Sequence, residues 1–334
     1  MVVPSTTREK VHWARRLARR RADAFYLDHV LTPICRRAHA GYDPARTVTL
    51  LGPRRAGSTW LQELLSSGPG VCPLFEPLYG SWWRRRYDIG DAPVLGPDEH
   101  DPVMAAFLTE VMCGRRMTPF LLSLAGSRQV VRADRFVLKD VRLNLAAGWL
   151  AGTFPDSPMV VVLRHPCAVV ESMQQVSWGP KTVARVLDDL PPLERTQVRA
   201  LLDGRTSLAS ALAAVWAVEV GALLDQTTPA TAQLVTYEHV WADVAGVLGP
   251  VMETAGLPRP SDLVERASRP SHTANASSVV RGQGDPVTAW TARLAPELRD
   301  EVLAVVRAAG VVGYGADPRP DEEALRDRHA AAPS

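Results

Sequence analysis

Three features are scarce in this 334-residue sequence: lysine, cysteine and long apolar runs. The four cysteines lie far apart and no pair has metal-ligand spacing, so the sequence predicts no metal site and fits a reducing cytoplasm. No apolar run reaches the ~18 residues that a membrane span requires. The first residues also lack the apolar segment of a secretory signal. We therefore expect a cytoplasmic protein.

Lysine occurs only at Lys10, Lys139 and Lys181, so arginine supplies nearly all of the 38 basic residues. GC-rich coding bias would explain this preference. The planar fork of arginine also suits phosphate and sulfate groups, and the two explanations are compatible. With 36 acidic residues the formal net charge is only +2, which gives no reason to expect a nucleic-acid partner.

The sequence divides into three segments. Residues 1–45 form a basic extension, in which residues 8–24 have apolar positions at helical spacing and predict an amphipathic helix with an arginine-rich face. This helix either packs on the main domain or contacts a membrane surface. Residues 46–315 form the main domain, and the charged, alanine-rich tail at 316–334 is expected to be flexible.

Short β-rich runs alternate with helical segments in the main domain, which predicts the α/β class. The run at 159–163 is uniformly apolar, as a strand buried in a parallel sheet is. We predict a P-loop-like open parallel sheet flanked by helices, with strands at residues 47–51, 136–139, 159–163 and 234–237. Outside the strands we expect helices at 59–67, 168–173 and 178–227, irregular structure at 81–118 and a mobile loop at 268–285.

The strongest local signal covers residues 50–60, where a predicted strand enters a glycine-containing turn that opens a helix. Such a helix start directs free backbone N–H groups and the positive dipole end to one point, so it binds anions. Gly57 would let the backbone approach an anion closely, and Arg55 would add a charged fork. Ser58 and Thr59 add hydroxyl donors. An ordinary helix N-cap at a tight turn is the alternative interpretation.

The spacing of Gly52 and Gly57 imitates a Walker A loop, but Ser58 stands where that loop has its lysine. The lysine neutralises phosphate charge, so its absence argues against an ordinary ATPase or kinase. A P-loop kinase or another nucleotide phosphotransferase stays open as an alternative, and it predicts dependence on ATP and Mg²⁺. A non-catalytic nucleotide-binding or membrane-associated scaffold is a further alternative, which only the basic N-terminal segment supports.

The same turn resembles the 5′-phosphosulfate loop of sulfotransferases that use 3′-phosphoadenosine-5′-phosphosulfate (PAPS) as donor. The resemblance implies that this loop binds the donor through Arg55, Ala56, Gly57, Ser58, Thr59 and Trp60. Ala56 stands where the family usually has serine, which removes one hydroxyl donor but leaves the backbone amide.

A second motif of the family is an arginine at the end of a strand with a serine eight residues later, and this pair binds the 3′-phosphate of PAPS. Arg164 and Ser172 have that spacing. Arg164 follows the predicted strand at 159–163, at the edge where doubly wound sheets bind ligands. Two phosphate-binding motifs in the family's order make the resemblance more specific than either motif alone.

Shorter segments resemble the carbohydrate, or Golgi-type, branch of these enzymes. Residues 75–78 are similar to its F-E-P segment, and residues 139–142 are similar to its K-x-V-R segment. Tyr237 opens a segment similar to Y-E-D, whose tyrosine lies near the adenine, and Arg281 loosely matches an R-K-G loop over the nucleotide. The resemblance thus implies donor contacts from Tyr237 and Arg281. It also implies that the acceptor is a glycan, a glycolipid or a glycosylated small molecule.

The activity implied by the resemblance is transfer of a sulfuryl group from PAPS to an acceptor hydroxyl, with no metal required. Glu76 is the expected general base. His100 and His165 are weaker rivals, and we expect His165 to be structural. Arg55 is expected to stabilise charge on the leaving group.

Lys139 and Arg142 have two open interpretations. They could serve the sulfate or the acceptor, with Lys139 in a catalytic role, or they could pair with carboxylates. Acceptor recognition is expected in residues 78–125 and 178–227.

Overall fold

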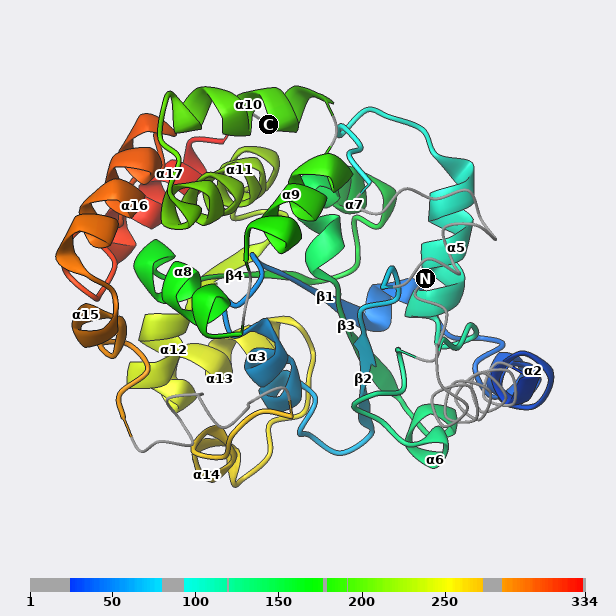
Figure 1. The fold of residues 1–334 in the computed structure, drawn as a ribbon. Coiled ribbons are helices and arrows are strands. Elements are labelled where there is room, and N and C mark those ends of the chain that lie inside the picture. The colour runs from blue at the N-terminus through cyan, green and yellow to red at the C-terminus, as the bar shows by residue number, and fades with distance from the viewer. Residues whose placement is uncertain are drawn as a thin grey trace, which may run out of the picture.

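In the computed structural model, residues 25–79, 93–118, 120–176, 179–190, 192–272 and 284–332 are described. Five parallel strands form one sheet in the order β2-β3-β1-β4-β5 (Figure 1). Their bounds are β1 Thr47–Leu51, β2 Val71–Phe75, β3 Arg135–Lys139, β4 Met159–Leu163 and β5 Gln233–Thr236. The predicted α/β class, with an open parallel sheet flanked by helices, is confirmed.

Strand β2 was not predicted from the sequence. Its five residues contain Pro73, and a proline within a short run argues against a strand in the interior of a sheet. β2 lies at the edge of the sheet and pairs only with β3, so the absent N–H of Pro73 breaks no ladder on a second side. The missed strand places Glu76 at its carboxyl end.

Side chains of the buried strands alternate between two helical layers. Val160 and Val162 of β4 face one layer, whereas Val161 and Leu163 face the other. The first layer comprises α3 Ser58–Leu65, α12 Tyr237–Ala242, α13 Val244–Thr254 and α14 Leu263–Ala267. The second includes α5 Pro102–Met112, α7 Ala147–Thr153, α8 Pro166–Gln175, α9 Pro180–Asp189, α10 Pro192–Leu202, α11 Leu208–Gln226 and α16 Pro296–Ala308. Figure 1 shows α3, α13 and α14 below the sheet and α9, α10 and α11 above it.

Shorter elements complete the described chain: η1 Leu27–Leu31, α2 Thr32–Ala38, η2 Pro44–Arg46, α6 Ser127–Val131, η3 Val141–Ala146, α15 Trp290–Arg293 and α17 Glu322–Ala330. Helices α9, α10 and α11 confirm the helical segment predicted at 178–227. The predicted N-terminal helix at 8–24 lies outside the described residues, as does most of the predicted loop at 268–285.

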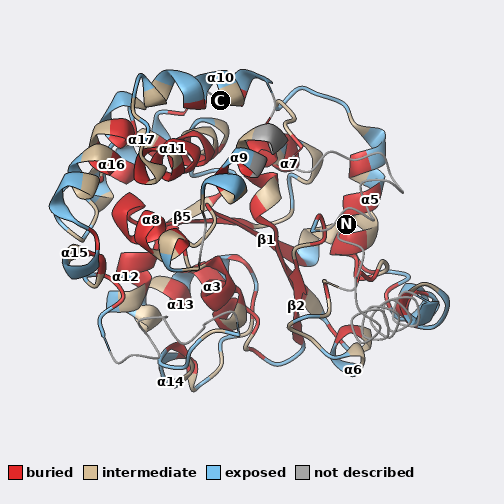
Figure 2. Cartoon of the chain, in the orientation of Figure 1, coloured by how far each residue is buried: buried red, intermediate tan, exposed pale blue. Residues whose placement is uncertain are grey.

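Helix α11 is the central helix of the second layer. Within the described part of the chain it is the one helix long and apolar enough to cross a membrane by length and composition, with a mean hydropathy of 1.6. However, 72% of that apolar window is buried inside the protein, where α11 contacts α8, α10 and α16. Figure 2 shows this burial next to the exposed outer surfaces of α10 and α16. α11 is therefore built like the core helix of a layered fold.

Two segments are more regular than the sequence predicted. Part of the stretch expected to be irregular forms α5, because Asp101 caps it by accepting the backbone N–H groups of Val103 and Met104. The tail expected to be flexible forms α17, in which Leu325 and His329 are buried. An apolar contact and a helix cap at Asp321 hold this helix, and a charged, alanine-rich composition reveals neither.

The docking of α17 leads to a prediction for Leu325→Ala. Leu325 is fully buried in the second layer, so its truncation should lower the free energy of unfolding by about 2–5 kcal/mol. Urea denaturation measures the change. Leu193→Ala is the matched control, because Leu193 is 66% exposed and should change stability by less than about 0.5 kcal/mol. Equal, small effects of both substitutions would show that α17 does not dock.

Candidate functional site

The carboxyl ends of all five strands carry residues of the candidate site. Because the strands are parallel, these ends lie at one edge of the sheet. β1 and β4 are neighbours, and the helices that follow them, α3 and α8, belong to opposite layers. The boundary between β1 and β4 is therefore the topological switch point, where parallel α/β sheets bind their ligands. Both predicted phosphate motifs start at this switch point.

The loop between β1 and α3 has the predicted turn geometry. Gly57 is the N-cap of α3 and has a left-handed backbone, with φ 85°. A side chain at this position would meet the Tyr237 ring at 2.5 Å. Leu61 donates the first backbone hydrogen bond of the helix to Gly57. The amides of Ser58 and Thr59 therefore precede the helical hydrogen bonds and are directed out of the helix start, where they can bind an anion.

The Ala56 amide has a partner within the turn. Its N–H donates to the carbonyl oxygen of Pro53 at 3.1 Å, and a role of Ala56 in donor binding stays a prediction from the sequence. The Ala56 side chain is fully buried. The Ala56 N–H, which the resemblance assigned to the ligand, thus forms a hydrogen bond within the turn.

The two predicted phosphate motifs meet through Arg55. Its Nε donates to Ser172 Oγ at 3.0 Å, and its carbonyl oxygen accepts from Arg164 Nη1 at 3.2 Å. Burial lowers the pKa of Arg55, and the neighbouring Arg164 lowers it further. Among the described residues, no carboxylate forms an ion pair with either guanidinium. Two adjacent cations at a helix start form a site for an anion, although the more distant Glu171 carboxylate partly offsets the charge of Arg55.

Tyr237 lies between the two motifs. The Arg164 guanidinium stands 4.3 Å from the centre of its ring, and the rings of Trp60 and Trp241 lie 5.2 and 6.2 Å away. Burial raises the pKa of Tyr237 to about 12, so the phenol stays protonated. Arg164 and Gly57 therefore pack against the Tyr237 ring, which does not present an open face to a ligand.

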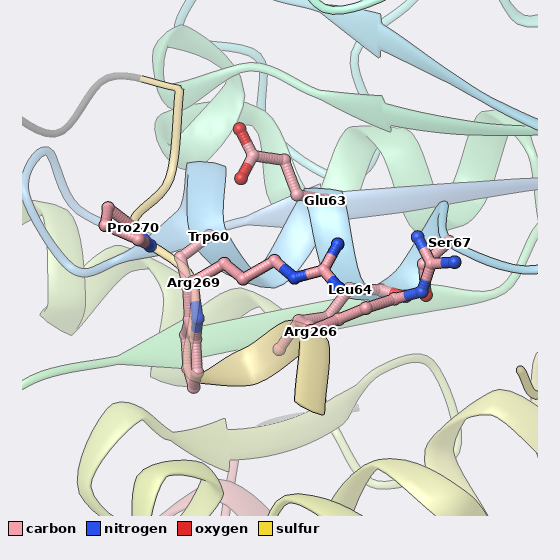
Figure 3. A pocket seen from close by; sticks show the side chains of 7 residues that line it. All are labelled: Trp60, Glu63, Leu64, Ser67, Arg266, Arg269 and Pro270. Carbon is pink, nitrogen blue, oxygen red and sulfur yellow. The ribbon is translucent and has the colours of Figure 1, made fainter. Parts of the chain in front are cut away.

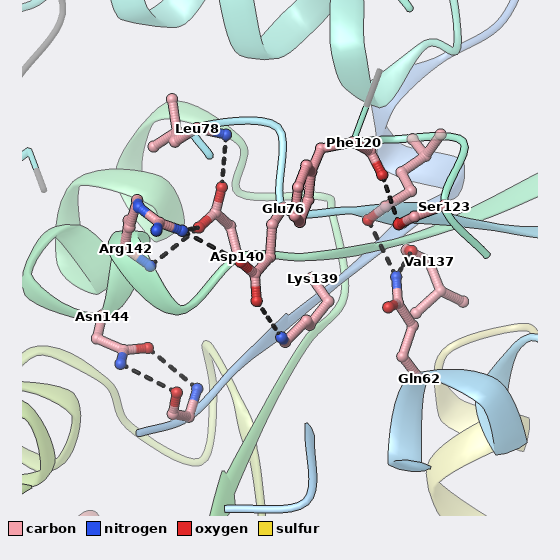
Figure 4. Close-up of polar contacts among 12 residues, drawn as sticks. Gln62, Glu76, Leu78, Phe120, Ser123, Val137, Lys139, Asp140, Arg142 and Asn144 are labelled. Atoms are coloured by element: carbon pink, nitrogen blue, oxygen red, sulfur yellow. Dashed lines mark hydrogen bonds and ion pairs between the residues drawn. The ribbon is translucent and has the colours of Figure 1, made fainter. Parts of the chain in front are cut away.

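Glu76 lies in a buried ion-pair cluster at the other end of the sheet edge (Figure 4). Its Oε1 is 2.5 Å from Lys139 Nζ, and its Oε2 is 3.2 Å from Arg142 Nη1. Burial alone would raise the pKa of Glu76, but the two cations together hold it below its usual value. Lys139 and Arg142 thus pair with a carboxylate, one of their two predicted roles.

Asp140 holds the backbone of this cluster in place. It is fully buried and accepts the N–H groups of Leu78 at 2.7 Å and Arg142 at 3.0 Å. Burial raises the pKa of Asp140, and Arg142 opposes that shift. The carboxylate thereby fixes the chain on both sides of the pair formed by Glu76 and Arg142.

The sequence matches the model of the sulfotransferase family over residues 48–261, which is more than half of the chain. The chain belongs to the sulfotransferase family. The matched region contains both phosphate motifs and the Glu76 cluster. Among the described residues, no group of three or more His, Cys, Asp or Glu side chains could hold a metal ion.

Three solved sulfotransferase structures are similar to this sulfotransferase at low identity. The sulfotransferase domain of the curacin biosynthetic pathway is 16% identical, with 81% of this chain and 98% of that one covered and a TM-score of 0.44. The sulfotransferase domain of the Synechococcus PCC 7002 olefin synthase is 16% identical, with coverages of 79% and 94% and a TM-score of 0.45. The Alicyclobacillus acidocaldarius sulfotransferase is 14% identical, with coverages of 78% and 91% and a TM-score of 0.40. A search of the curated proteins finds no match.

His100 and His165, the two predicted rivals of Glu76 as general base, lie in different surroundings. His100 is exposed in the loop before α5. His165 accepts the Cys167 N–H at Nδ1 (3.2 Å), and its Nε2 lies 3.0 Å from the Gly315 carbonyl oxygen. Burial lowers the pKa of His165 to about 4, so it is neutral with both nitrogens engaged, as a structural residue is. Arg281 lies outside the described residues.

A cavity of about 200 Å³ lies beside α3, against α14 (Figure 3). It is lined by Trp60, Glu63, Leu64, Ser67, Arg266, Arg269 and Pro270. Arg266 is 2.8 Å from Asp262, and Arg269 is 2.6 Å from Glu265, so each arginine has a carboxylate partner on or next to its own helix. The cavity therefore offers the aromatic surface of Trp60, and the positive charge of its two arginines is largely balanced.

Three polar residues in or near the phosphate loop were not predicted from the sequence: Arg54, Asn144 and Glu219. Glu219 had the clearest signal, since it is the single charged residue in an otherwise apolar stretch of α11 before Asp225. A lone carboxylate in a core helix requires a partner. Its partners lie far away in the sequence, so the sequence alone does not identify them.

The Glu76 cluster predicts a pH-dependent stability difference between wild type and Glu76→Gln. Near pH 7 the loss of two charge-assisted contacts should lower the free energy of unfolding by about 1.5–3 kcal/mol. Because the folded-state pKa of Glu76 is lowered, the wild-type advantage exists above the ordinary glutamate pKa of about 4.3 and disappears as the pH falls through the folded value. Urea denaturation across this pH range measures it. A difference that stays constant down to about pH 2 would contradict the ionised pair.

Proposed function

We propose that this sulfotransferase transfers the sulfuryl group of PAPS to a hydroxyl group of an acceptor that carries a sugar. The contact of Arg55 with both Ser172 and Arg164 is the observation that supports this donor most strongly. PAPS carries a 5′-phosphosulfate and a separate 3′-phosphate. A loop at a helix start, joined to a second arginine that directly follows the neighbouring strand, offers charge for both groups.

The proposed roles in the donor site follow from where each donor lies. The amides of Ser58 and Thr59 would hold the 5′-phosphosulfate, and Arg55 would stabilise charge on the leaving bridging oxygen. Arg55 contacts Ser172 through Nε, and among the described residues its terminal nitrogens have no hydrogen-bond partner that would keep them from a ligand. Arg164, with Ser172, would bind the 3′-phosphate. Sulfuryl transfer resembles phosphoryl transfer in that positioning and charge stabilisation supply most of the rate enhancement.

For the adenine we propose the side of the loop marked by Trp60 and Tyr237. Trp60 borders the cavity beside α3 and supplies an aromatic surface there. Tyr237 is covered by Gly57 and Arg164, so its proposed contribution is to hold the Arg164 guanidinium in place. A role for Arg281 over the nucleotide stays a prediction from the sequence.

Glu76 remains the proposed base. Its lowered pKa keeps it ionised at neutral pH, as a base must be, while Lys139 beside it offers positive charge for the oxygens of the transferring group. The same cations reduce the proton affinity of Glu76. The acceptor hydroxyl would therefore have to displace at least one of them as it approaches.

The alternatives differ from this proposal in the ligand they require. A nucleotide phosphotransferase would bind ATP with Mg²⁺, and a scaffold would bind nucleotide without turnover. The glycan, glycolipid or glycosylated acceptor comes from the resemblance to the carbohydrate branch at residues 75–78 and 139–142. Contact with a membrane surface through residues 8–24 and a cytoplasmic location stay predictions from the sequence.

Donor identity predicts selective binding of the product 3′,5′-bisphosphoadenosine over 5′-AMP, measured by calorimetry. Arg164→Ala should weaken binding of the bisphosphate by about 1.5–3 kcal/mol and leave the affinity for 5′-AMP almost unchanged. Because Arg164 also donates to the carbonyls of Arg55 and Pro286, binding should be measured well below the melting temperature of the variant. Arg36→Ala, which removes an exposed arginine on α2, is the control. Equal wild-type affinities for the two nucleotides would overturn the 3′-phosphate assignment.

Glu76→Gln tests the base. If Glu76 accepts the hydroxyl proton, kcat should fall about 10²–10⁴-fold with donor affinity unchanged, since the amide cannot take up a proton. Steady-state kinetics and nucleotide calorimetry separate the two effects. His100→Ala is the comparison, and it should leave kcat at the wild-type value. A large fall in His100→Ala with no fall in Glu76→Gln would reassign the base.

A further inference from the structure

The phosphate loop is anchored at its first residue by the side-chain amide of Asn144. Asn144 Oδ1 accepts the Gly52 N–H at 3.0 Å, and Asn144 Nδ2 donates to the Gly52 carbonyl oxygen at 3.0 Å (Figure 4). On its other side, Gly52 approaches β4 so closely that a side chain would meet the Val162 carbonyl oxygen at 2.4 Å. Gly52 is therefore held between a strand and a buried amide at the point where β1 becomes the loop.

Glu219 joins this anchor from the second helical layer. It is 3% exposed and lies on α11. One carboxylate oxygen contacts Arg54 Nη1, and the other accepts from Asn144 Nδ2 at 3.4 Å. Burial raises the pKa of Glu219, and Arg54 and Asn144 oppose the shift. Burial of a carboxylate costs free energy unless the carboxylate is paired. Arg54 and Asn144 must therefore stay in place for the folded state to tolerate Glu219.

Two consecutive arginines leave the loop in different directions. Arg54 reaches back to Glu219 in the core, whereas Arg55 reaches Ser172 at the anion site. Arg55 has a left-handed backbone with φ 67°, a conformation that is unfavourable for a non-glycine residue. Such a conformation persists only when its surroundings enforce it. The anchored residues Gly52 and Arg54 stand on the side of Arg55 that faces β1.

We propose that Asn144 and Glu219 are positioning residues of the donor site. They fix Gly52 and Arg54, and through them they direct Arg55 and the first amides of α3 at one point. Neither side chain is required to touch the donor. The identity of the bound anion rests on the function proposed above, whereas the anchoring itself rests on the contacts of Gly52 and Arg54.

The anchor and an ordinary stabilising ion pair predict different measurements. An ion pair that serves only stability would lower the melting temperature when broken and leave the ligand affinity of the folded protein unchanged. The anchor also affects affinity, because a loop that samples several conformations must be ordered when the ligand binds. Binding to the folded variant, well below its melting temperature, is therefore the measurement that separates them.

The test uses Glu219→Gln, which keeps the size of the side chain and removes its charge. Its dissociation constant for 3′,5′-bisphosphoadenosine should rise about tenfold, which corresponds to ~1.4 kcal/mol. Glu301→Gln is the matched control, because Glu301 accepts hydrogen bonds from Ser207 and Ser210 at the start of α11, away from the loop. Its nucleotide affinity should equal that of wild type, with any change confined to stability.

Arg54→Lys provides a second route if Glu219→Gln does not fold. It keeps the positive charge opposite Glu219 but lacks the forked reach of arginine, and it should also weaken binding severalfold. Unchanged affinity in a folded Glu219→Gln or Arg54→Lys variant would overturn the anchor.

Inorganic sulfate separates failure of the anchor from failure of the donor assignment. If wild type binds sulfate but not the bisphosphate, the donor proposal fails, and the sulfate affinities of the variants still decide the anchor. If wild type binds neither ligand, the loop is not an anion site and the anchor proposal fails with it.

Discussion

Two like charges at one helix start are the constraint on which the rest of this sulfotransferase depends. Arg55 and Arg164 stand next to each other, joined by a hydrogen bond from one guanidinium to the other residue's carbonyl oxygen. Their mutual repulsion is unfavourable until an anion arrives. The fold therefore surrounds them with groups that hold them in place: Ser172 on Arg55, and the Tyr237 ring and the Pro286 carbonyl on Arg164. The binding energy of the anion would offset the cost of this arrangement.

The two ends of the carboxyl edge of the sheet differ in how their charged side chains are paired. At the loop between β1 and α3, Arg55 forms no ion pair with a carboxylate among the described residues, whereas Arg54 pairs with Glu219 in the core. At the ends of β2 and β3, Glu76 is matched by Lys139 and Arg142, and the chain near Arg142 is tied down by Asp140. If Glu76 is the base proposed above, the acceptor must displace a cation that stabilises the folded cluster, so the proposed chemistry and the stability make conflicting demands on it.

The strands and motifs with strong local patterns were predictable from the sequence. β1 and β4 were predicted at their observed bounds, because both are short runs rich in β-branched and apolar residues next to a distinctive turn. β2 was missed because Pro73 is tolerable only at a sheet edge, and the position of a strand in a sheet is a tertiary property. Asn144 and Glu219 were missed for a similar reason. Asn144 meets Gly52 across 92 residues, and no local pattern encodes such a contact.

The link between His165 and the Gly315 carbonyl has a consequence for the order in which the molecule can be completed. His165 directly follows Arg164, and its ring stacks on Trp290 and meets the edge of Tyr314. Part of the support behind Arg164 therefore comes from a segment that lies 150 residues later in the chain. On the ribosome, the sheet and the phosphate loop can assemble while Arg164 still lacks that support. Arg164 therefore reaches its final surroundings only after residues 290–315 have been synthesised and have packed against His165.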